Sequence, residues 1–236
     1  MLLLRSFLFY LGFVPMTIVI ASLFILLFPI QSKTLRNRIA SFWCTSALNW
    51  LRFSCGVQYQ IIGLENLPAR SAVYVANHQS SWEAILLYKL AYPVSPILKK
   101  ELLRIPFWGW SMRLQQPIAI DRSNPREAGK SMLTQGVERL NRGMSVIVFP
   151  EGSRSPAGAI KKFSRGGAKL AIAAGAPIVP ISHNAGDCWP PRKFIKQPGL
   201  ITVTIGEAID SSKHSASELT EKIERWIRDN CRTSRS

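Results

Sequence analysis

The stretch Ala72-Val73-Tyr74-Val75-Ala76-Asn77-His78-Gln79-Ser80-Ser81-Trp82-Glu83 decides how this 236-residue chain can be interpreted. Its first five residues form a short, continuous apolar run, which is typical of a buried strand in a parallel sheet. His78 follows two residues later, so we expect it to leave the end of a strand and enter a loop. Open α/β sheets place their binding and catalytic groups at this end of their strands.

Two interpretations of the pair His78 and Glu83 stay open at this point. Glu83 could orient the imidazole, so that His78 acts as a general base. Alternatively, Ser80-Ser81-Trp82-Glu83 is a capping box, with Ser80 as the N-cap and Glu83 at the third helical position. Positions five apart on one helix point about 140° apart, so a working pair requires His78 to lie in the loop before the helix.

The charge of the chain is strongly basic. Thirty Lys and Arg residues stand against 14 Asp and Glu residues, a formal net charge of +16, and the first acidic residue is Glu65. This balance favours a polyanionic partner, either nucleic acid or an anionic membrane surface. The four cysteines are scattered and the chain has three histidines, so we expect neither a metal site nor a disulfide framework, and a reduced, cytosol-facing domain.

The N-terminal region favours an anionic membrane surface, and not nucleic acid, as the polyanionic partner. Residues 6–30 carry no charge, and a helix of that length would be about 37 Å long, which exceeds a hydrocarbon core of roughly 30 Å. The run is too long for the apolar part of a signal peptide, and no small-x-small cleavage pattern precedes the basic residues 33–38. Pro15 leaves two geometries open: a kinked span, or two half-helices that dip into one leaflet.

Residues 34–54 have the spacing of an amphipathic helix with Trp43 and Trp50 on its apolar face. This face could lie in the membrane interface or pack on the globular domain. Residues 1–56 are therefore predicted to form a membrane anchor, and residues 57–236 a separate catalytic domain. The basic residues after the apolar run predict that this side faces the cytoplasm.

From residue 57 onward, short strands alternate with helices, which predicts an α/β fold with a mixed sheet flanked by helices. The expected strands are Val57 to Ile62, Ala72 to Ala76, Val94 to Leu98, Ile118 to Ile120, Ser145 to Phe149, Ile178 to Ile181 and Leu200 to Ile205. The clearest helix start is Asn124-Pro125-Arg126-Glu127, with an N-cap, a proline at the first position and a glutamate at the third. Further helices are expected over Ser164 to Ala174 and from Ser217.

Three more motifs follow predicted strands. Lys100 lies in a basic and aromatic segment after Ile97-Leu98, and Arg122 follows Ile118-Ala119-Ile120-Asp121. Each has an ordinary alternative, a solvated helix for Lys100 and a surface pair with Asp121 for Arg122. The third motif, Pro150-Glu151-Gly152-Ser153-Arg154-Ser155, combines a tight glycine turn, a hydroxyl and a guanidinium, which together favour an anion-binding site.

In this order, the motifs resemble those of the 1-acylglycerol-3-phosphate acyltransferases. The resemblance also includes Ala176-Pro177-Ile178-Val179-Pro180-Ile181 and covers roughly residues 57–206. It implies a single glycerolipid-acyltransferase-like domain in which His78 and Glu83 are catalytic. The substrate-binding residues that it implies are Lys100, Arg122, Glu151, Gly152, Ser153 and Arg154. Two positions depart from the family pattern, because Glu83 replaces the usual aspartate and Ser153 the commoner threonine.

The resemblance implies acyl transfer from a thioester donor, acyl-CoA or acyl carrier protein, to the 2-hydroxyl of lysophosphatidic acid, which gives phosphatidic acid. It implies no metal and no bound cofactor, and a location on the cytoplasmic face of a bacterial inner membrane. Two alternatives remain: acylation of another lyso-lipid, or a non-catalytic basic protein that binds membranes or nucleic acid. The sequence contains no recognised nucleic-acid motif, so we expect no nucleic-acid partner.

Overall fold

The computed structural model describes residues 1–91, 93–121 and 123–231, which form seven strands in one mixed sheet flanked by helices. The strands are β1 (Val57–Ile62), β2 (Val73–Ala76), β3 (Val94–Lys99), β4 (Ile118–Ile120), β5 (Ser145–Val148), β6 (Ile178–His183) and β7 (Gly199–Ile205). Each predicted strand is present, with bounds that differ by no more than two residues. The predicted α/β fold class is therefore confirmed.

The strand order β1-β7-β6-β2-β5-β3-β4 places the five strands β6, β2, β5, β3 and β4 side by side and parallel. Strand β7 runs antiparallel to β6, and β1 runs parallel to β7. The carboxyl ends of the five parallel strands consequently share one edge of the sheet. The loops after β2, β3, β4 and β5 contain the motifs that the sequence singles out.

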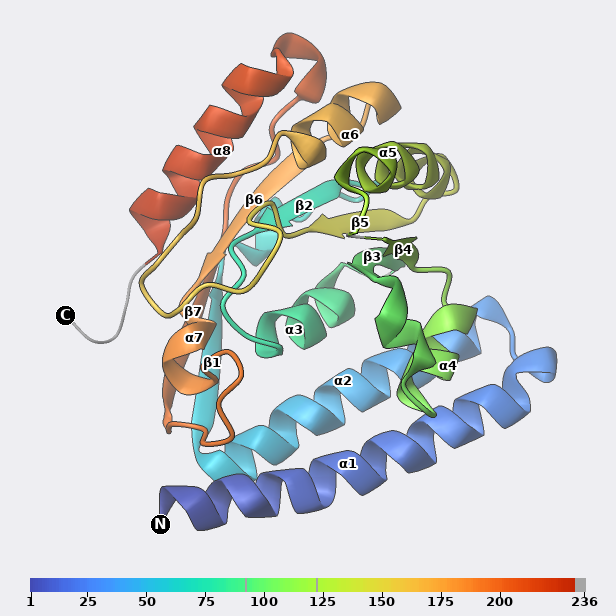
Figure 1. Cartoon of the computed structure of the whole chain (residues 1–236), viewed down its shortest axis with the longest axis vertical. Helices are drawn as coiled ribbons and strands as arrows, with labels where there is room; N and C mark the ends of the chain where they lie inside the picture. The colour runs from blue at the N-terminus through green and yellow to red at the C-terminus, as the bar shows by residue number, and fades with distance from the viewer. Residues whose placement is uncertain (92, 122, 232–236) are drawn as a thin grey trace.

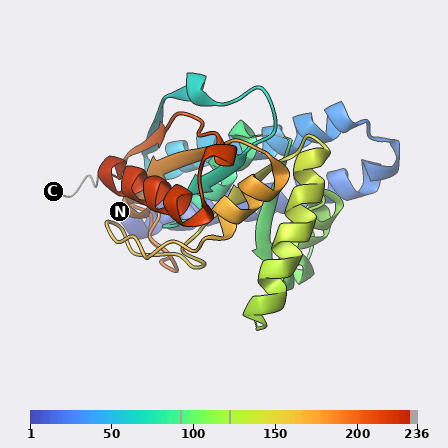
Figure 2. The same ribbon diagram turned by 90° about the horizontal axis from the view of Figure 1, so that it is seen from above.

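Side chains alternate across the sheet and form two cores. Val73 and Val75 of β2 point to the core that includes α5 (Pro125–Asn141), α6 (Gly166–Ala174) and α8 (Ala216–Asn230). Figure 2 shows these three helices on one side of the sheet. Tyr74 and Ala76 point to the opposite core, which is covered by α3 (Trp82–Leu90). Helix α2 (Lys33–Cys55) and then α1 (Leu2–Leu27) are stacked behind α3 (Figure 1). Both faces of β2 are therefore buried, as its continuous apolar run predicts.

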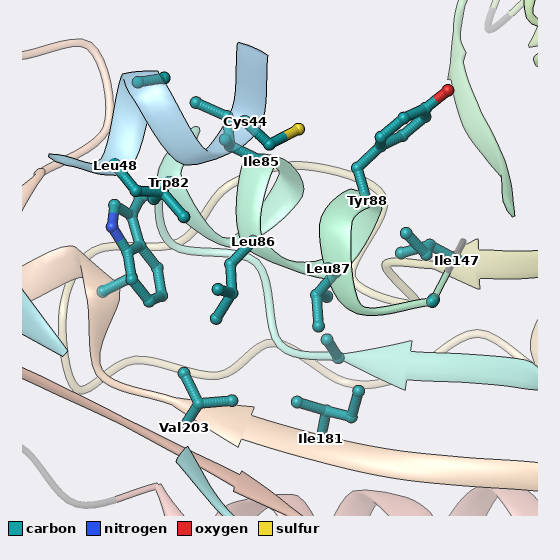
Figure 3. Packing of buried hydrophobic residues seen from close by; sticks show 14 of the residues in the cluster. Cys44, Leu48, Trp82, Ile85, Leu86, Leu87, Tyr88, Ile147, Ile181 and Val203 are labelled. Carbon is teal, nitrogen blue, oxygen red and sulfur yellow. The ribbon is translucent and has the colours of Figure 1, made fainter. Parts of the chain in front are cut away.

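Helix α3 is buried between the sheet and α2, which explains why it is apolar on nearly every side. Leu86 and Leu87 point towards Ile181 and Val203 of the sheet, and its other side packs on α2 (Figure 3). This helix carries Glu83 in its first turn, so tight packing on two sides fixes the position of that carboxylate.

The remaining helical elements are short connections. They are η2 (Leu64–Asn66), η3 (Lys100–Arg104), α4 (Trp108–Leu114), α7 (Ala185–Cys188) and η4 (Ser211–Lys213). Helix α5 begins as predicted, with the Asn124 side chain accepting a hydrogen bond from the backbone N–H of Glu127. Helices α6 and α8 also form, although α6 begins two residues later than expected and α8 one residue earlier.

The N-terminal region is a pair of long helices, α1 (Leu2–Leu27) and α2 (Lys33–Cys55), joined through η1 (Phe28–Ile30). Both predicted helices are therefore present, and α1 continues through Pro15 instead of dividing into two half-helices. The Trp43 indole N–H donates to the Thr17 hydroxyl (3.0 Å), and that of Trp50 donates to the Phe9 carbonyl (2.9 Å). These tryptophans thus contact α1, the other predicted part of the anchor, a position that the sequence did not predict.

The outward side of α1 is a long apolar surface. Leu3, Leu4, Phe7, Leu11 and Val19 are among its exposed residues. By length and composition, the segment from Leu2 to Ile30 is the one membrane-span candidate within the described residues. Helix α1 could therefore anchor the protein to a membrane.

Candidate active site

His78 lies in the loop between β2 and α3 and contacts Glu83 directly. Its Nδ1 is 2.8 Å from Glu83 Oε1. The same oxygen accepts the backbone N–H groups of Gln79 (3.0 Å) and Ser80 (2.8 Å). A single carboxylate oxygen therefore closes the loop and orients the imidazole.

The helix begins one residue later than the predicted capping box requires. Ser81 is the N-cap of α3, and the Ser80 hydroxyl accepts a hydrogen bond from the backbone N–H of Trp82 (3.1 Å). The other half of the capping box forms, because Glu83 binds the backbone N–H of Ser80. His78 remains outside the helix, so the capping contact and the His78–Glu83 contact occur together.

The electrostatics of the pair favour an ionised Glu83. Only 1% of the Glu83 side chain is exposed, and this burial works to raise its pKa. The nearby imidazoles of His183 and His78 and the backbone N–H of Ser80 outweigh burial, so the pKa of Glu83 lies below its ordinary value. An ionised carboxylate can only accept, which places the His78 proton on Nδ1 and directs the lone pair of Nε2 towards a substrate.

The ring of His78 is held on its flat side as well as its edge. Phe149, which follows β5, stacks on the imidazole with ring centroids 4.1 Å apart and planes 16° apart. The side chain of His78 remains 14% exposed, so a reactant can approach it. Stacking and the Glu83 contact together restrict the imidazole to one orientation.

Glu151 joins the His78 loop to the turn after β5. Its Oε1 accepts the backbone N–H of His78 (2.7 Å), and its Oε2 accepts the backbone N–H of Lys161 (3.0 Å) and the hydroxyl of Ser155. The backbone N–H of Ser155 in turn donates to the His78 carbonyl (2.7 Å). Both oxygens of Glu151 are thus engaged in hydrogen bonds that hold the His78 loop against the turn.

The turn itself presents a hydroxyl and two cations. Gly152 has φ +72°, a left-handed conformation that favours glycine, and an added Cβ would meet no atom within 4 Å. Arg154 is exposed, and its Nε donates to the Ser80 carbonyl (2.9 Å), which orients the guanidinium. Lys161 Nζ donates to the Ser153 hydroxyl (2.6 Å). Arg154, Ser153 and Lys161 therefore form one polar group beside the His78 loop.

Lys100 is not part of this group. It begins η3, directly after β3, which pairs with β5 (Pro96 opposite Ile147) and further along with β4 (Lys99 opposite Ile120). Lys100 forms an exposed ion pair with Asp121. Hydrogen bonding from Lys100 lowers the pKa of Asp121. Arg122 lies outside the described residues.

Local pattern did not predict three contributors to the site. Lys161 lies seven residues beyond Arg154 in a loop, and Phe149 looked like the last residue of a strand. His183 is 2% exposed; its ring Nε2 is 2.8 Å from the Asn77 carbonyl, and burial lowers its pKa. His183 Nε2–H therefore donates to the Asn77 carbonyl and supports the backbone next to His78. Within the part of the chain that the structure describes, no cluster of His, Cys, Asp and Glu could hold a metal ion.

The site combines a strand-end imidazole, oriented by a buried carboxylate, with a cationic turn, and comparison with known proteins identifies the chain as an acyltransferase. A family model described as "Acyltransferase" matches residues 58–184. The 1-acyl-sn-glycerol-3-phosphate acyltransferase of Pseudomonas aeruginosa is 42% identical over 227 residues, covering 94% of this chain and 88% of that protein. The enzyme of the same name from Saccharomyces cerevisiae is 30% identical over 207 residues, covering 78% of this chain and 68% of that protein.

A solved structure matches over nearly the whole chain. The crystal structure of the 1-acyl-sn-glycerophosphate (LPA) acyltransferase PlsC from Thermotoga maritima superposes with a TM-score of 0.83 at 25% identity, covering 97% of this chain and 93% of that one. The chain belongs to the 1-acyl-sn-glycerol-3-phosphate acyltransferase family.

Proposed function

We propose that this protein transfers an acyl chain from a thioester donor to the 2-hydroxyl of 1-acylglycerol-3-phosphate and so forms phosphatidic acid. The observation that carries the proposal is the joining of the His78–Glu83 pair to the cationic turn through Glu151. Glu151 holds a general base next to an anion-binding turn. This pairing suits a substrate in which a hydroxyl, for the base, lies close to a phosphate, for the turn. The names of the relatives at 42% and 30% identity support the same acceptor.

The proposed reaction needs no protein nucleophile. His78 Nε2 accepts the proton of the 2-hydroxyl while the oxygen attacks the thioester carbonyl. The tetrahedral intermediate then collapses, the C–S bond breaks, and the imidazolium returns the proton to the leaving thiolate. Glu83 stabilises the imidazolium, and Phe149 keeps the ring in place. A thioester is already activated, so the chemistry requires neither a metal nor a bound cofactor.

The phosphate is assigned to Arg154, Ser153 and Lys161. The Nε contact of Arg154 with Ser80 leaves its terminal amino groups to face a ligand, and Lys161 adds a second cation. The turn at Gly152 brings these groups together. Lys100 and Arg122 remain predicted contributors that would neutralise the remaining charge of the phosphate.

The donor is proposed as acyl-CoA or acyl carrier protein. The membrane association is assigned to the outward side of α1, which is apolar along its length. Helix α1 packs lengthwise on α2, and the Trp43 and Trp50 contacts hold the two together. This arrangement favours a geometry in which one side of α1 is buried in a single leaflet, and disfavours one in which α1 spans the bilayer. The basic composition of the chain favours binding to an anionic cytoplasmic leaflet, such as that of a bacterial inner membrane.

The acceptor can be identified by supplying radiolabelled acyl-CoA, or acyl carrier protein charged with the same chain, to membranes that contain the protein. Lysophosphatidic acid is offered beside lysophosphatidylethanolamine, lysophosphatidylglycerol and a lyso-aminolipid. We expect label in phosphatidic acid, at a rate well above that for the other acceptors. Label in another product alone would identify a different lyso-lipid acyltransferase, and no label with either donor would remove the enzymatic assignment.

Arg154→Ala and Lys161→Met should each raise the KM for lysophosphatidic acid by about 10- to 100-fold, because each removes a charge-assisted contact worth about 1.5–3 kcal/mol. The KM for the acyl donor should change little. Lys162→Met is the matched control, since Lys162 is exposed and adjacent. Equal increases in both KM values would argue against phosphate binding at this turn.

A further inference from the structure

The loop of residues 189–198 packs on the N-terminal half of α1 and exposes its own apolar tip. This loop connects α7 to β7, and Figure 1 shows it beside the start of α1. Phe194 and Ile195 are 45% and 37% exposed. Arg192 and Lys193 precede them and are also exposed. The proposed chemistry uses none of these four residues.

Lys196 fixes the tip against α1. It is fully buried, and its Nζ donates to the Tyr10 hydroxyl (2.8 Å) and to the carbonyls of Phe194 (2.7 Å) and Lys193 (3.0 Å). Its backbone N–H donates to the Ser6 hydroxyl (2.8 Å). Burial lowers the pKa of Lys196 to about 8, so at neutral pH the ammonium is still mostly protonated. The loop is therefore held in one conformation.

The tip continues the apolar surface of α1. Phe194 stacks on Tyr10 with ring centroids 4.9 Å apart. Leu3, Phe7 and Val14 are exposed residues that share the Tyr10 side of α1, because they are spaced from Tyr10 by seven, three and four residues, respectively. The exposed part of Phe194 thus extends a surface that begins on α1.

The charged side chains of this surface are all positive. The sequence has no acidic residue between Asp187 and Glu207, nor any before Glu65. Arg192 and Lys193 therefore flank the apolar tip without a carboxylate from the loop or from α1. Apolar side chains next to uncompensated cations are the combination that binds the interface of an anionic bilayer.

We propose that residues 192–195 form a second membrane contact on the catalytic domain, in which Phe194 and Ile195 enter the headgroup region and Arg192 and Lys193 bind anionic lipid phosphates. This inference rests on the proposed burial of the outward side of α1 in a leaflet. It fixes the domain to the bilayer at two places, α1 and this loop. Lys196 and Tyr10 set the angle between them.

The test attaches a polarity-sensitive fluorophore to Ile195→Cys in the full-length chain with Cys231→Ser, since Cys44, Cys55 and Cys188 are buried. The labelled protein is bound to vesicles of phosphatidylcholine with or without phosphatidylglycerol, some of which carry a lipid-attached quencher. We expect a blue shift and strong quenching at position 195 in anionic vesicles. Adding Arg192→Gln and Lys193→Gln should lower the ratio of docked to undocked loop about 25-fold, about fivefold for each charge.

Two labelled positions serve as controls. Ile172→Cys on α6 has the same exposure as Ile195, 37%, and lies on the opposite side of the sheet, so it should stay in water. Leu11→Cys, on the outward side of α1, should be quenched in every vesicle to which the protein binds. Quenching at Leu11 without quenching at position 195 would overturn the loop contact, while acyl transfer would be unaffected. Protection of position 195 by acyl carrier protein instead of lipid would also overturn it.

Discussion

His78→Ala should lower the rate of acyl transfer by about 10²- to 10⁴-fold, the usual contribution of a positioned general base. The expected loss arises in the chemical step, because the 2-hydroxyl would have no acceptor for its proton. Binding of lysophosphatidic acid should persist, because Arg154 binds the Ser80 carbonyl and Lys161 is joined to His78 only through Glu151 and the His78 backbone N–H. Single-turnover rates and equilibrium binding of the acceptor separate the two quantities.

The fold gives reasons to expect that the His78→Ala variant remains intact. The contacts of His78 with Glu151 and Ser155 use its backbone N–H and carbonyl, which alanine retains. The side chain loses the Glu83 contact and the Phe149 stack. His214→Ala is the matched control, because His214 lies beside η4, away from the carboxyl edge of the parallel strands. Full turnover by purified His78→Ala enzyme would remove His78 from the mechanism.

The strands and the His78 loop could be predicted because their signals are local. Continuous apolar runs such as Val73–Ala76 are long enough to indicate strands buried on both faces, and the N-cap at Asn124 needs only neighbouring residues. The two contacts of Glu83, with His78 and with the backbone N–H of Ser80, could also be predicted, because both partners lie within five residues of it. The start of α3 was misplaced by one residue, since the Ser80 hydroxyl binds Trp82 instead of Glu83.

Contacts between distant segments could not be predicted from local pattern. Lys161 joins the turn through Glu151 and Ser153, eight to ten residues away across a loop without a regular period. The Lys196 contacts with Ser6 and Tyr10 join segments about 190 residues apart. Asp121 was considered as a partner of Arg122, yet its ion pair within the described residues is with Lys100, a neighbour only through the pairing of β3 with β4.

Glu83→Gln should separate the two roles of Glu83, because glutamine keeps the shape of the side chain and removes its charge. The amide oxygen can still accept from His78, Gln79 and Ser80, so the helix start should be preserved. Glu83 Oε2 is buried, and the hydrogen bonds of the described residues do not include it, so the amide N–H₂ of glutamine would lack an acceptor there. We expect a loss of about 1–3 kcal/mol in stability.

The expected loss of activity in Glu83→Gln is larger, about 10²- to 10⁴-fold, because an amide does not stabilise the imidazolium that forms during transfer. Glu83→Asp retains the charge but shortens the side chain by one bond, about 1.5 Å, and should lose about tenfold or less. Single-turnover rates of the two variants test this order. Glutamine activity equal to that of the parent enzyme would reduce Glu83 to a helix-start residue.

Acid titration gives Glu83→Gln a second readout. The pKa of Glu83 is lowered from 4.5 by the imidazoles and the Ser80 N–H, against the effect of burial, so the unfolded chain binds the proton more tightly than the folded one. The stabilisation is complete above about pH 4.5 and is lost as the pH falls through the lower folded pKa. Glu83→Gln should show a smaller loss of unfolding free energy in that range.

The double variant His78→Ala with Glu83→Gln should be no slower in acyl transfer than His78→Ala alone, because a carboxylate that acts only through the imidazole has nothing left to orient.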